Sequence, residues 1–469
     1  MTRAVVVGSG PNGLAAALTL AAAGVEVEVL EAADRIGGGT RSSELTIPGL
    51  VHDECSGFHP LAIDTPFSRE FDLGAHGLHW CSAPVEYAHP LDGGRGAIAR
   101  RSVRETEDGL GPDGRTWHRI VGRLAESFDR IAPEILQPVA HLPSHPVALG
   151  RFGTLALTPA ALLARRFETP EARALFAGVA AHAMRDLARP LSSSIGVALG
   201  AAAHRYGWQV AEGGSASISN AMAQALESYG GTITTGVTVT DINEVAPAEI
   251  VMLDVAPRAA VAILGDRLPR HVAAGLHRYR HGPGAFKVDF AIDGDVPWQH
   301  PGSRAAGTVH VGGTMEEMEA NERAVARGAM PERPFVLVGQ QYLADPSRSV
   351  GDLHPLYAYA HVPAGFTGDA TAAIEAQIER FAPGFRDRIV ARHVTSTTDF
   401  ERHNANYVGG DVVTGLNSAR QLAFRPRIAL NPYRLGRRGF YLCSAATPPG
   451  AGAHGMCGWN AAQTALRDL

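Results

Sequence analysis

The sequence predicts an α/β protein with a parallel sheet, built from separated stretches of the chain, and a second, α+β domain. An apolar run at residues 4–7 leads into the glycine-rich residues 8–13, an alanine- and leucine-rich stretch, and a second apolar run at 26–30. The order strand, glycine loop and helix recurs at residues 439–466. Because consecutive βα units of this kind share one sheet, we expect both segments to meet in it.

The first glycine motif predicts a dinucleotide site. Gly8 allows a tight turn, Gly10 lets the backbone approach a pyrophosphate, and Gly13 lets the next helix pack closely on the sheet. That helix directs its positive dipole end and free N–H groups at the phosphates. An acid, Glu31, ends the second strand, where its carboxylate can accept hydrogen bonds from ribose hydroxyls and repel the extra phosphate of an NADP-type ligand.

Two simpler interpretations of this segment were weighed. The first is a chance glycine turn in an ordinary βαβ unit, which is disfavoured because the strand, the helix and an acid at the right distance occur together. A secretory leader is disfavoured because glycines and Asn12 interrupt the apolar run, and Glu26 and Glu28 follow it.

Composition narrows the class of protein. The chain has 469 residues, enough for two or three domains, and its 45% hydrophobic and 19% charged residues indicate a large core. A net charge of −5 gives no reason to expect nucleic acid as a partner. We expect a cytoplasmic protein with reduced cysteines and no metal site, because its four cysteines form no CxxC pair: Cys55, Cys81, Cys443 and Cys457.

The basic residues are almost all arginine, because Lys287 is the only lysine among 42 lysine and arginine side chains. A coding bias towards arginine explains most of this imbalance. The surviving lysine is then a candidate for a position that needs a compact, titratable amine. Drift, or a lysine on an exposed strand face, is the alternative.

Hydrophobic periodicity places further elements between the two glycine motifs. We expect Ser215 to cap a helix that Gly230-Gly231 ends. The predicted helices span 120–135, 171–187, 215–229 and 371–381, and the predicted strands span 232–241, 249–255, 285–292 and 335–338.

The order of these elements suggests a domain plan. Residues 1–66, 205–265 and 405–469 would form a discontinuous Rossmann-type nucleotide domain. Residues 67–204 and 266–404 would form the substrate domain.

The motifs together resemble a known group. Glu31, Arg35-Ile36-Gly37-Gly38, Glu212-Gly213-Gly214 and Pro449-Gly450-Ala451-Gly452 occur in this order. This order is similar to that of the FAD-dependent phytoene desaturase and amine oxidase superfamily, and most of all to its phytoene-dehydrogenase-like branch. The resemblance spans nearly the whole chain. The family usually has an arginine after the paired glycines, whereas this chain has Gly39, with Arg41 nearby.

The resemblance implies bound FAD, with its adenine end at the first βαβ unit. Val239 would contact the adenine through its backbone, and the last helix would point at the pyrimidine edge of the flavin. The implied cofactor-binding residues are Gly8, Gly10, Pro11, Asn12, Gly13, Glu31, Ala32, Arg35, Gly37, Gly38, Gly39, Thr40, Arg41, Val239, Ser444, Gly452, His454, Gly455 and Met456.

Three residues are candidates for catalysis. Lys287 loosely matches the family lysine that holds a water near flavin N5. His454 lies in the glycine loop expected beside the flavin, and His59 follows the segment near FAD, so each is a candidate acid or base. Most of the 20 histidines are expected to be structural. Cys457 suggests covalent flavin attachment far less strongly than it suggests a buried helix cysteine.

The leading function is an FAD-dependent oxidoreductase that oxidises or desaturates a mostly apolar small molecule by hydride transfer to flavin N5. No second GxGxxG has a strand and helix around it, so oxygen or a quinone is the expected electron acceptor. A flavin amine oxidase and an FAD-bearing interaction protein without turnover are the alternatives. Residues 73–80 and 146–163 are candidate apolar walls of the substrate site, or ordinary core. Oligomeric state and peripheral membrane contact stay open.

Overall fold

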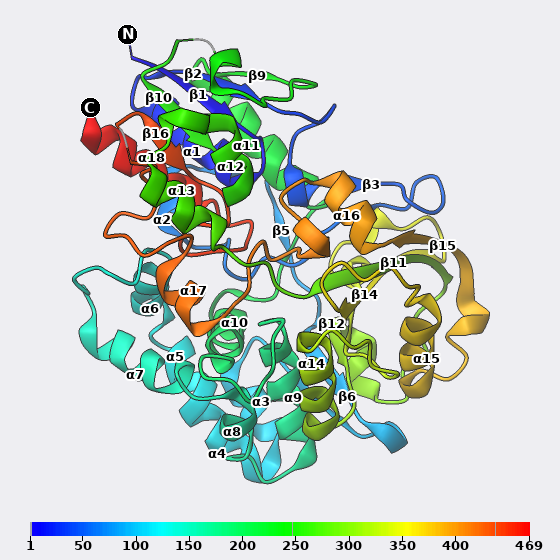
Figure 1. Cartoon of the computed structure of the whole chain (residues 1–469). Coiled ribbons are helices and arrows are strands. Elements are labelled where there is room, and N and C mark those ends of the chain that lie inside the picture. Colours follow the sequence, from blue (N-terminus) through cyan, green and yellow to red (C-terminus); the bar gives the residue numbers. More distant parts are fainter. Residues whose placement is uncertain (1, 246, 437) are drawn as a thin grey trace.

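The computed structural model describes residues 2–245, 247–436 and 438–469. Its first sheet has five strands in the order β16-β10-β1-β2-β9, all parallel to their neighbours. It occupies the top of Figure 1, where the blue and red ends of the chain lie together. The strands are β1 (Arg3–Val7), β2 (Glu26–Leu30), β9 (Thr232–Thr234), β10 (Ile250–Leu253) and β16 (Phe440–Leu442).

The strand order contains a switch point between β1 and β10. The chain passes from β1 to β2 and β9 on one side, then returns to build β10 and β16 on the other. In open parallel sheets, ligands bind outside the carboxyl ends of the strands at such a point. The α/β fold with a Rossmann-type sheet made from distant segments is therefore confirmed.

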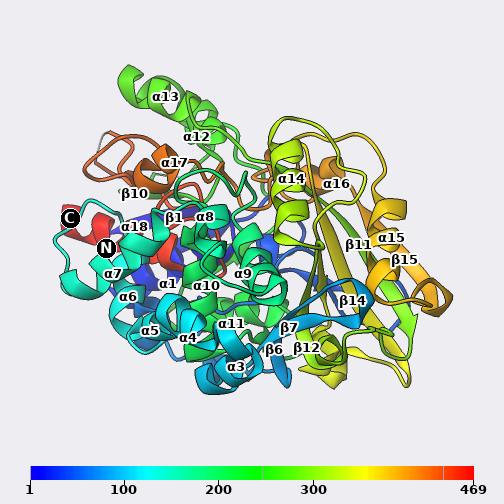
Figure 2. The ribbon, with the colours of Figure 1, turned by 90° about the horizontal axis from the view of Figure 1, so that it is seen from below.

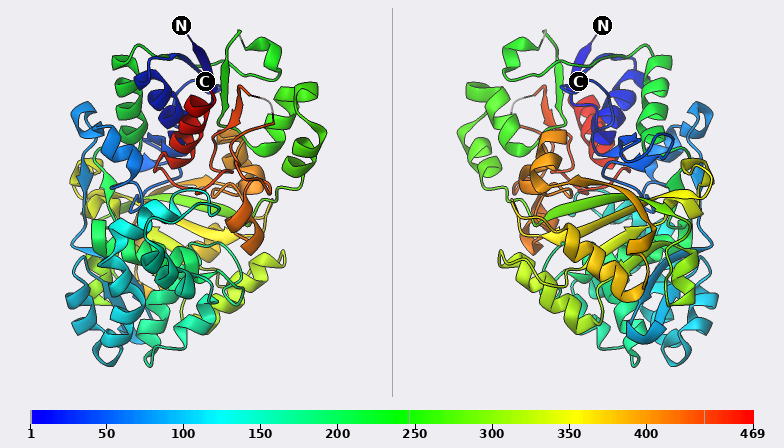
Figure 3. Two further views of the ribbon diagram at one scale, coloured as in Figure 1. Left: turned by 90° about the vertical axis from the view of Figure 1, so that its left-hand side faces the viewer. Right: turned by 90° about the vertical axis from the view of Figure 1, so that its right-hand side faces the viewer.

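Helices cover both faces of this sheet (Figure 3). Ala4 and Val6 pack against α1 (Pro11–Ala22), α11 (Ala216–Ser228) and α18 (Met456–Asp468). The alternate residues Val5 and Val7 pack on the opposite face against α12 (Pro257–Leu264) and α13 (Arg270–His277). Burial on both faces explains why these strands are continuously apolar.

The second sheet has seven strands in the order β15-β11-β14-β13-β12-β6-β7, and it is mixed because β12 pairs with β6 in parallel. Figure 2 shows it on the right, with α15 beside it. Its strands are β6 (Val85–Pro90), β7 (Gly96–Ala99), β11 (Gly284–Asp293), β12 (Ala306–Val311), β13 (Val336–Gly339), β14 (Leu353–Val362) and β15 (Ile389–Thr395). This sheet confirms the second, mixed domain.

The two faces of the seven-stranded sheet differ in chemistry. Phe286, Val288 and Phe290 of β11 pack with α15 (Thr371–Phe381) in an apolar cluster. Side chains alternate along a strand, so Lys287 and Asp289 lie on the other face. Helices α9 (Pro170–Ala181) and α14 (Met315–Ala326) approach the sheet on that face. Polar groups of β11 therefore face the interior of the molecule.

The remaining elements are short strands and a helical layer below the first sheet. Two small antiparallel sheets pair β3 (Ser42–Ser43) with β4 (His52–Asp53), and β5 (Trp80–Cys81) with β8 (Val210–Ala211). The other α-helices are α2 (Pro66–Glu70), α3 (Val103–Gly109), α4 (Gly114–Trp117), α5 (Arg123–Ala125), α6 (Phe128–Ile135), α7 (Pro146–Ala156), α8 (Ala160–Ala164), α9 (Pro170–Ala181), α10 (Ser193–Tyr206), α14 (Met315–Ala326), α16 (Thr397–His403) and α17 (Ala419–Phe424). Within the described ranges, no helix combines the length and apolarity that crossing a bilayer requires.

Three predicted elements differ from the structure. The helix expected over 120–135 breaks before α6, where the Ser127 hydroxyl donates to the carbonyl of Arg123 and competes with the helix. The helix expected over 171–187 ends at Ala181. The strand expected over 232–241 ends at Thr234, opposite the last residue of β2, Leu30, and beyond it the Gly236 and Val237 amides donate to the Ala33 and Glu31 carbonyls outside the ladder.

The crossing of α1 and α18 generates a test of packing. A Cβ added at Gly458 would overlap the carbonyl oxygen of Asn12, whereas one added at Gly150 in α7 would meet no atom. We therefore expect Gly458→Ala to lower the free energy of unfolding by at least about 2 kcal/mol. The control Gly150→Ala should raise it by about 0.5–1 kcal/mol, because alanine favours a helix. Denaturant unfolding measures both, and equal effects would contradict the packing account.

Candidate functional site

The first glycine loop, residues 8–13, packs tightly against Asp254, the residue that follows β10. Gly8 has a φ of 101°, and a Cβ there would lie 2.9 Å from the carbonyl oxygen of Asp254. A Cβ at Gly10 would lie 2.7 Å from Asp254 Oδ2, and one at Gly13 would overlap the Gly8 carbonyl. All three glycines are thus required by contacts within the protein, and the loop lies at the carboxyl end of β1.

A second glycine segment packs on the first. The Gly37 amide donates to the Ser9 carbonyl at 3.0 Å, and a Cβ at Gly38 would lie 3.1 Å from Gly10 Cα. Both Gly37 and Gly38 have positive φ values, of 108° and 51°. Two segments that the sequence analysis assigned to one cofactor therefore touch at the switch point of the sheet.

Glu31 organises this pair of loops. Its carboxylate accepts hydrogen bonds from the Ser9 amide (2.8 Å), the Ser9 hydroxyl (2.5 Å) and the Ala33 amide (2.9 Å). The guanidinium of Arg41 lies 3.5 Å from it and donates to three backbone carbonyls. Glu31 thus holds the loop that would carry a pyrophosphate, and its contact with a ribose stays a prediction.

Arg35 and Arg41 exchange the positions that the motif suggested. Arg35 is exposed and forms an ion pair with Glu54, while Arg41 is buried next to Glu31. Thr40 donates its hydroxyl to the Gly37 carbonyl, and a Cβ at Gly39 would overlap the Tyr407 hydroxyl. A glycine replaces the usual family residue at position 39 because Tyr407 occupies that space.

Asp254 is a functional residue that the sequence analysis missed. It follows β10 directly, as Glu31 follows β2, and this parallel was the available signal. Its carboxylate accepts a hydrogen bond from the Gly13 amide at 2.9 Å and so caps the first turn of α1. Burial raises its pKa to about 7, and the nearby Glu31 carboxylate adds to the effect. Asp254 therefore carries less negative charge near neutral pH than an ordinary aspartate does.

The C-terminal glycine loop brings the start of α18 to the same edge. His454 Nδ1 accepts a hydrogen bond from the Met456 amide at 3.1 Å and caps that helix. Burial lowers the pKa of His454 to about 4, so its ring is neutral at pH 7. The Cys457 thiol is buried and donates to the carbonyls of Gly450 and Thr447. The four cysteines are free, as expected.

Two buried polar atoms at this edge fit a bound dinucleotide. Asn12 Oδ1 in the first turn of α1 and Ser444 Oγ just after β16 have no hydrogen-bond partner among the described residues. Unpaired buried polar groups are costly, so a ligand that pairs with them is favoured. Val239 packs with Val7 and Leu30, at the carboxyl ends of β1 and β2 where an adenine would lie. Pro11 begins α1 and Ala32 is exposed.

Lys287 lies on β11, fully buried, on the polar face of the second sheet. Its ammonium forms an ion pair with Asp289 and lies 4.5 Å from the centre of the Tyr357 ring. Burial opposes ionisation of Asp289, yet Lys287 and His52 hold the pKa of that carboxyl below its usual value. Tyr359 pairs directly with Lys287 across the β11–β14 ladder. Lys287 is therefore a compensated buried cation, and the exposed-lysine alternative is wrong.

His59 belongs to a different cluster. Its Nε2 lies 2.9 Å from the Ser215 hydroxyl, which in turn donates to the carbonyl of Ser56. Burial lowers the pKa of His59 to about 4. Ser215 begins α11 as predicted, but its side chain does not cap the helix because it is engaged with Ser56 and His59.

Arg348 is the centre of that cluster, and no sequence pattern singled it out among the arginines. Its guanidinium lies 2.6 Å from Asp53 and 3.1 Å from Asp345, and all three side chains are buried. Asp53 also accepts hydrogen bonds from the Ser215 amide and the Ser42 hydroxyl. Burial opposes ionisation of Asp53, but Arg348 and these donors lower its pKa.

The segment from His52 to His59 links these features. His52 approaches Asp289, and the Cys55 carbonyl accepts a hydrogen bond from Tyr357 at 2.5 Å. Asp289 and Tyr357 therefore connect Lys287 to the segment that ends at His59. Among the described residues, no recorded hydrogen bond or ion pair joins His454 to either of them, so the three catalytic candidates do not form one hydrogen-bonded group.

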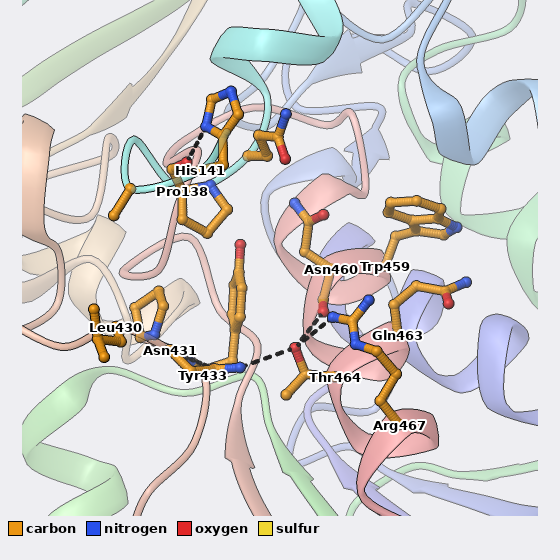
Figure 4. Close-up of a pocket in the computed structure, with 13 residues that line it drawn as sticks. Pro138, His141, Leu430, Asn431, Tyr433, Trp459, Asn460, Gln463, Thr464 and Arg467 are labelled. Carbon is orange, nitrogen blue, oxygen red and sulfur yellow. Dashed lines mark hydrogen bonds between the residues drawn. The ribbon is translucent and has the colours of Figure 1, made fainter. Parts of the chain in front are cut away.

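A surface pocket of about 440 Å³ lies beside α18 (Figure 4). Trp459, Asn460 and Arg467 line it from the helix, opposite Pro138 and Leu430. It contains none of the predicted cofactor-binding residues among its lining side chains. It is separate from the glycine-loop edge described above.

The fold and the glycine-loop edge define the class, an α/β protein with a Rossmann-type half and a mixed-sheet second half. Residues 6–84 match the family model of the NAD(P)-binding Rossmann-like domain. The chain is homologous to pyridine nucleotide-disulfide oxidoreductase domain-containing protein 2 of Rattus norvegicus. The two are 25% identical over 549 residues, covering 99% of this chain and 93% of the relative.

Solved structures share the fold over the whole chain. An oxidoreductase from Methanosarcina mazei superimposes with a TM-score of 0.62 at 15% identity, covering 99% of this chain and 100% of that one. A double mutant of putrescine oxidase superimposes with a TM-score of 0.59 at 19% identity, covering 100% and 98%. The expected resemblance to the amine oxidase superfamily is confirmed at the level of fold.

The raised pKa of Asp254 generates a prediction about pH. Its native pKa of about 7 lies above the ordinary value of 3.8, so native protein binds an extra proton between these values and loses stability as pH rises. Asp254→Asn keeps an acceptor for the Gly13 amide and removes this loss. We expect it to stabilise the protein at about pH 8 by up to about 4 kcal/mol, and much less near pH 4.

Thermal unfolding of the variant and the parent across this pH range measures the difference. Asp266→Asn removes an exposed carboxylate and is the matched control, for which we expect no such trend. An equal effect of Asp254→Asn at both ends of the range would contradict the buried-acid account.

Proposed function

We propose that this protein is an FAD-dependent oxidoreductase that oxidises or desaturates a mostly apolar small molecule. The observation that carries the proposal is the meeting of both glycine loops and two helix N-termini at one sheet edge, next to unpaired Asn12 and Ser444. Bound FAD would accept a hydride equivalent at flavin N5 from a substrate C–H bond.

The two helix N-termini at this edge, from α1 and α18, support FAD over a nicotinamide dinucleotide. The α1 loop and Glu31 would hold the pyrophosphate and ribose of the adenosine half. The N-terminus of α18, formed from distant sequence, would place a second positive dipole end near the flavin pyrimidine and stabilise its negative charge. Asn12 and Ser444 would supply polar contacts between these ends. Oxygen or a quinone is the electron acceptor that we propose.

The polar face of the second sheet supports a role for Lys287 at the reacting centre. Its amine is the cationic group on β11, and Asp289 compensates its charge. Tyr357, Tyr359 and His361 continue this face along β14, so the neighbourhood is aromatic apart from the ion pair. In this setting the Lys287 amine would orient a water and exchange a proton with it. An uncharged substrate with apolar surface suits such a wall.

A flavin amine oxidase is the second candidate, and one observation favours it. Tyr357 and Tyr359 form a perpendicular aromatic pair with ring centres 5.8 Å apart, beside Lys287. Aromatic faces can hold an amine through cation–π contacts. Putrescine oxidase and cyclohexylamine oxidase are among the proteins with the same fold. An FAD-bearing protein without turnover is the third candidate, and the experiments below distinguish it from the two enzymes.

Flavin binding is tested first. We expect the purified protein to carry flavin absorbance, or to take up added FAD. Glu31→Ala should weaken FAD binding by at least about tenfold, or about 1.4 kcal/mol, because it loses the ribose acceptor and the anchor of Ser9. Fluorescence titration measures this loss.

Glu28→Ala is the matched control, since Glu28 lies on the same strand and pairs with Arg3 at the surface. We expect its FAD affinity to equal that of the parent. A parent protein that takes up no FAD would contradict the proposed function. Equal binding by both variants would reject only the role of Glu31.

The role of Lys287 is tested with a panel of amines, alcohols and polyenes under anaerobic conditions, read by flavin bleaching. With the substrate so found, Lys287→Met should slow flavin reduction or reoxidation by about a hundredfold or more. Lys287→Arg should also be slow, because a guanidinium keeps its proton. Unchanged half-reactions in Lys287→Met would assign the lysine to structure, and a panel that bleaches nothing would favour the reading without turnover.

A further inference from the structure

A row of polar side chains leads from Lys287 towards the surface. The ammonium of Lys287 donates to Asp289 Oδ2, and His52 Nδ1 lies 3.4 Å from the other carboxylate oxygen, Oδ1. On the far side of the imidazole, His52 Nε2 lies 2.8 Å from the Thr46 hydroxyl. Lys287, Asp289 and His52 are almost completely buried, whereas Thr46 is partly exposed. The row therefore has one end in the interior and one at solvent.

The row contains more polar groups than are needed to neutralise the buried charge of Lys287. Asp289 alone balances the charge of Lys287, and the pair would be complete without a third titratable group. Yet Asp289 Oδ1 accepts no hydrogen bond within the described residues and faces His52. A buried oxygen that is left free beside an imidazole nitrogen is costly in a purely structural ion pair, but it is required of an acceptor that passes a proton on.

We propose that Asp289, His52 and Thr46 form a proton path between the Lys287 amine and solvent. The proposal deepens the proposed function and rests on it for its purpose. Two-electron oxidation of a substrate by hydride loss also releases one proton, which must leave a site closed by the sheet and its covering helices. The path removes that proton, or returns one when the reaction requires it.

Each transfer along the path balances. The Lys287 ammonium gives a proton to Asp289 and becomes a neutral amine. The carboxyl group turns about its Cβ–Cγ bond and gives the proton to His52 Nδ1, becoming a carboxylate again. The imidazolium then releases the proton on Nε2 through Thr46 to water, so one proton enters and one leaves. The ring is left protonated on Nδ1, and a proton carried inward, from water to Nε2 and on from Nδ1 to Asp289, restores the first tautomer. In this scheme, Asp289 and His52 act through Lys287.

The outlet lies in the loop between β3 and β4. Leu45, next to Thr46, lines a surface pocket of about 280 Å³ together with His393, which stands directly opposite Asp289 in the β11–β15 ladder. Titratable side chains that line the same pocket are Glu54, Asp399 and His403. Solvent therefore reaches the loop on the side of the sheet that carries the ion pair, where these groups can exchange protons with water.

The single lysine makes the path directly observable. Protein grown with lysine labelled with ¹⁵N at Nζ gives one side-chain ammonium signal, from Lys287. We expect the exchange of its Nζ protons with water to slow by at least about tenfold in His52→Phe and in Thr46→Val, because each interrupts the path. Thr46→Val changes a partly exposed residue and keeps its shape. It can therefore test the path even if His52→Phe does not fold.

The control removes a similar hydroxyl elsewhere. Ser349 contacts His354 Nδ1 at 2.8 Å, in a pair that has no recorded contact with Lys287 or Asp289. Ser349→Ala should leave the exchange rate at its parent value. An equal slowing in this control would show a general loss of local opening and overturn the proposal.

Rescue provides a positive test. His52→Ala leaves space for a small base, and free imidazole added to the buffer should restore the exchange rate towards that of the parent. Parent-like exchange in both Thr46→Val and His52→Ala would overturn the path. The measurement needs no substrate or turnover, so its outcome is separate from FAD uptake, on which the proposed function depends.

Discussion

The structure depends on one close contact, in which the N-terminus of α1 packs directly against the backbone at the ends of β1 and β10. Gly8 and Gly13 let the helix approach β1 and β10, and Gly458 lets α18 cross it at Asn12. A single methyl group at any of these positions would collide with backbone. Because helices of three distant segments cover one face of the sheet, this contact fixes where their N-termini meet. The ligand edge is thus a consequence of packing, and its Ser9 and Gly13 amides are held in place by the carboxylates of Glu31 and Asp254.

Buried charge ties the two halves of the molecule together. Isolated buried ions are unfavourable by several kcal/mol, so each is compensated here, and each cluster includes one contact between distant segments. Arg348 joins Asp53 to Asp345, and Asp289 joins Lys287 to His52. The segment around residues 52–59 is common to both sets of contacts. It runs between the nucleotide half and the polar face of the second sheet, so it sets the position of one relative to the other.

The sequence predicted the parts of the site that depend on local pattern. The loops at residues 8–13 and 37–38 follow from glycines at fixed distances from an apolar strand, and Lys287 stood out through composition. Arg348 and Asp254 were missed, because a buried ion pair and a helix cap supplied by another strand depend on contacts across hundreds of residues. The strand expected to reach Asp241 failed for the same reason, since the end of its partner decides where pairing stops.

The two halves divide the chemistry. At the glycine-loop edge, binding groups are backbone amides and polar atoms, and the acids there are hydrogen-bonded or close to neutral. The titratable groups free to exchange protons lie instead on the second sheet. In the proposed proton path, an arginine in place of Lys287 would still carry a charge opposite to that of Asp289 but could not give up its proton. The proposal therefore assigns to this single lysine a transferable proton in addition to its charge.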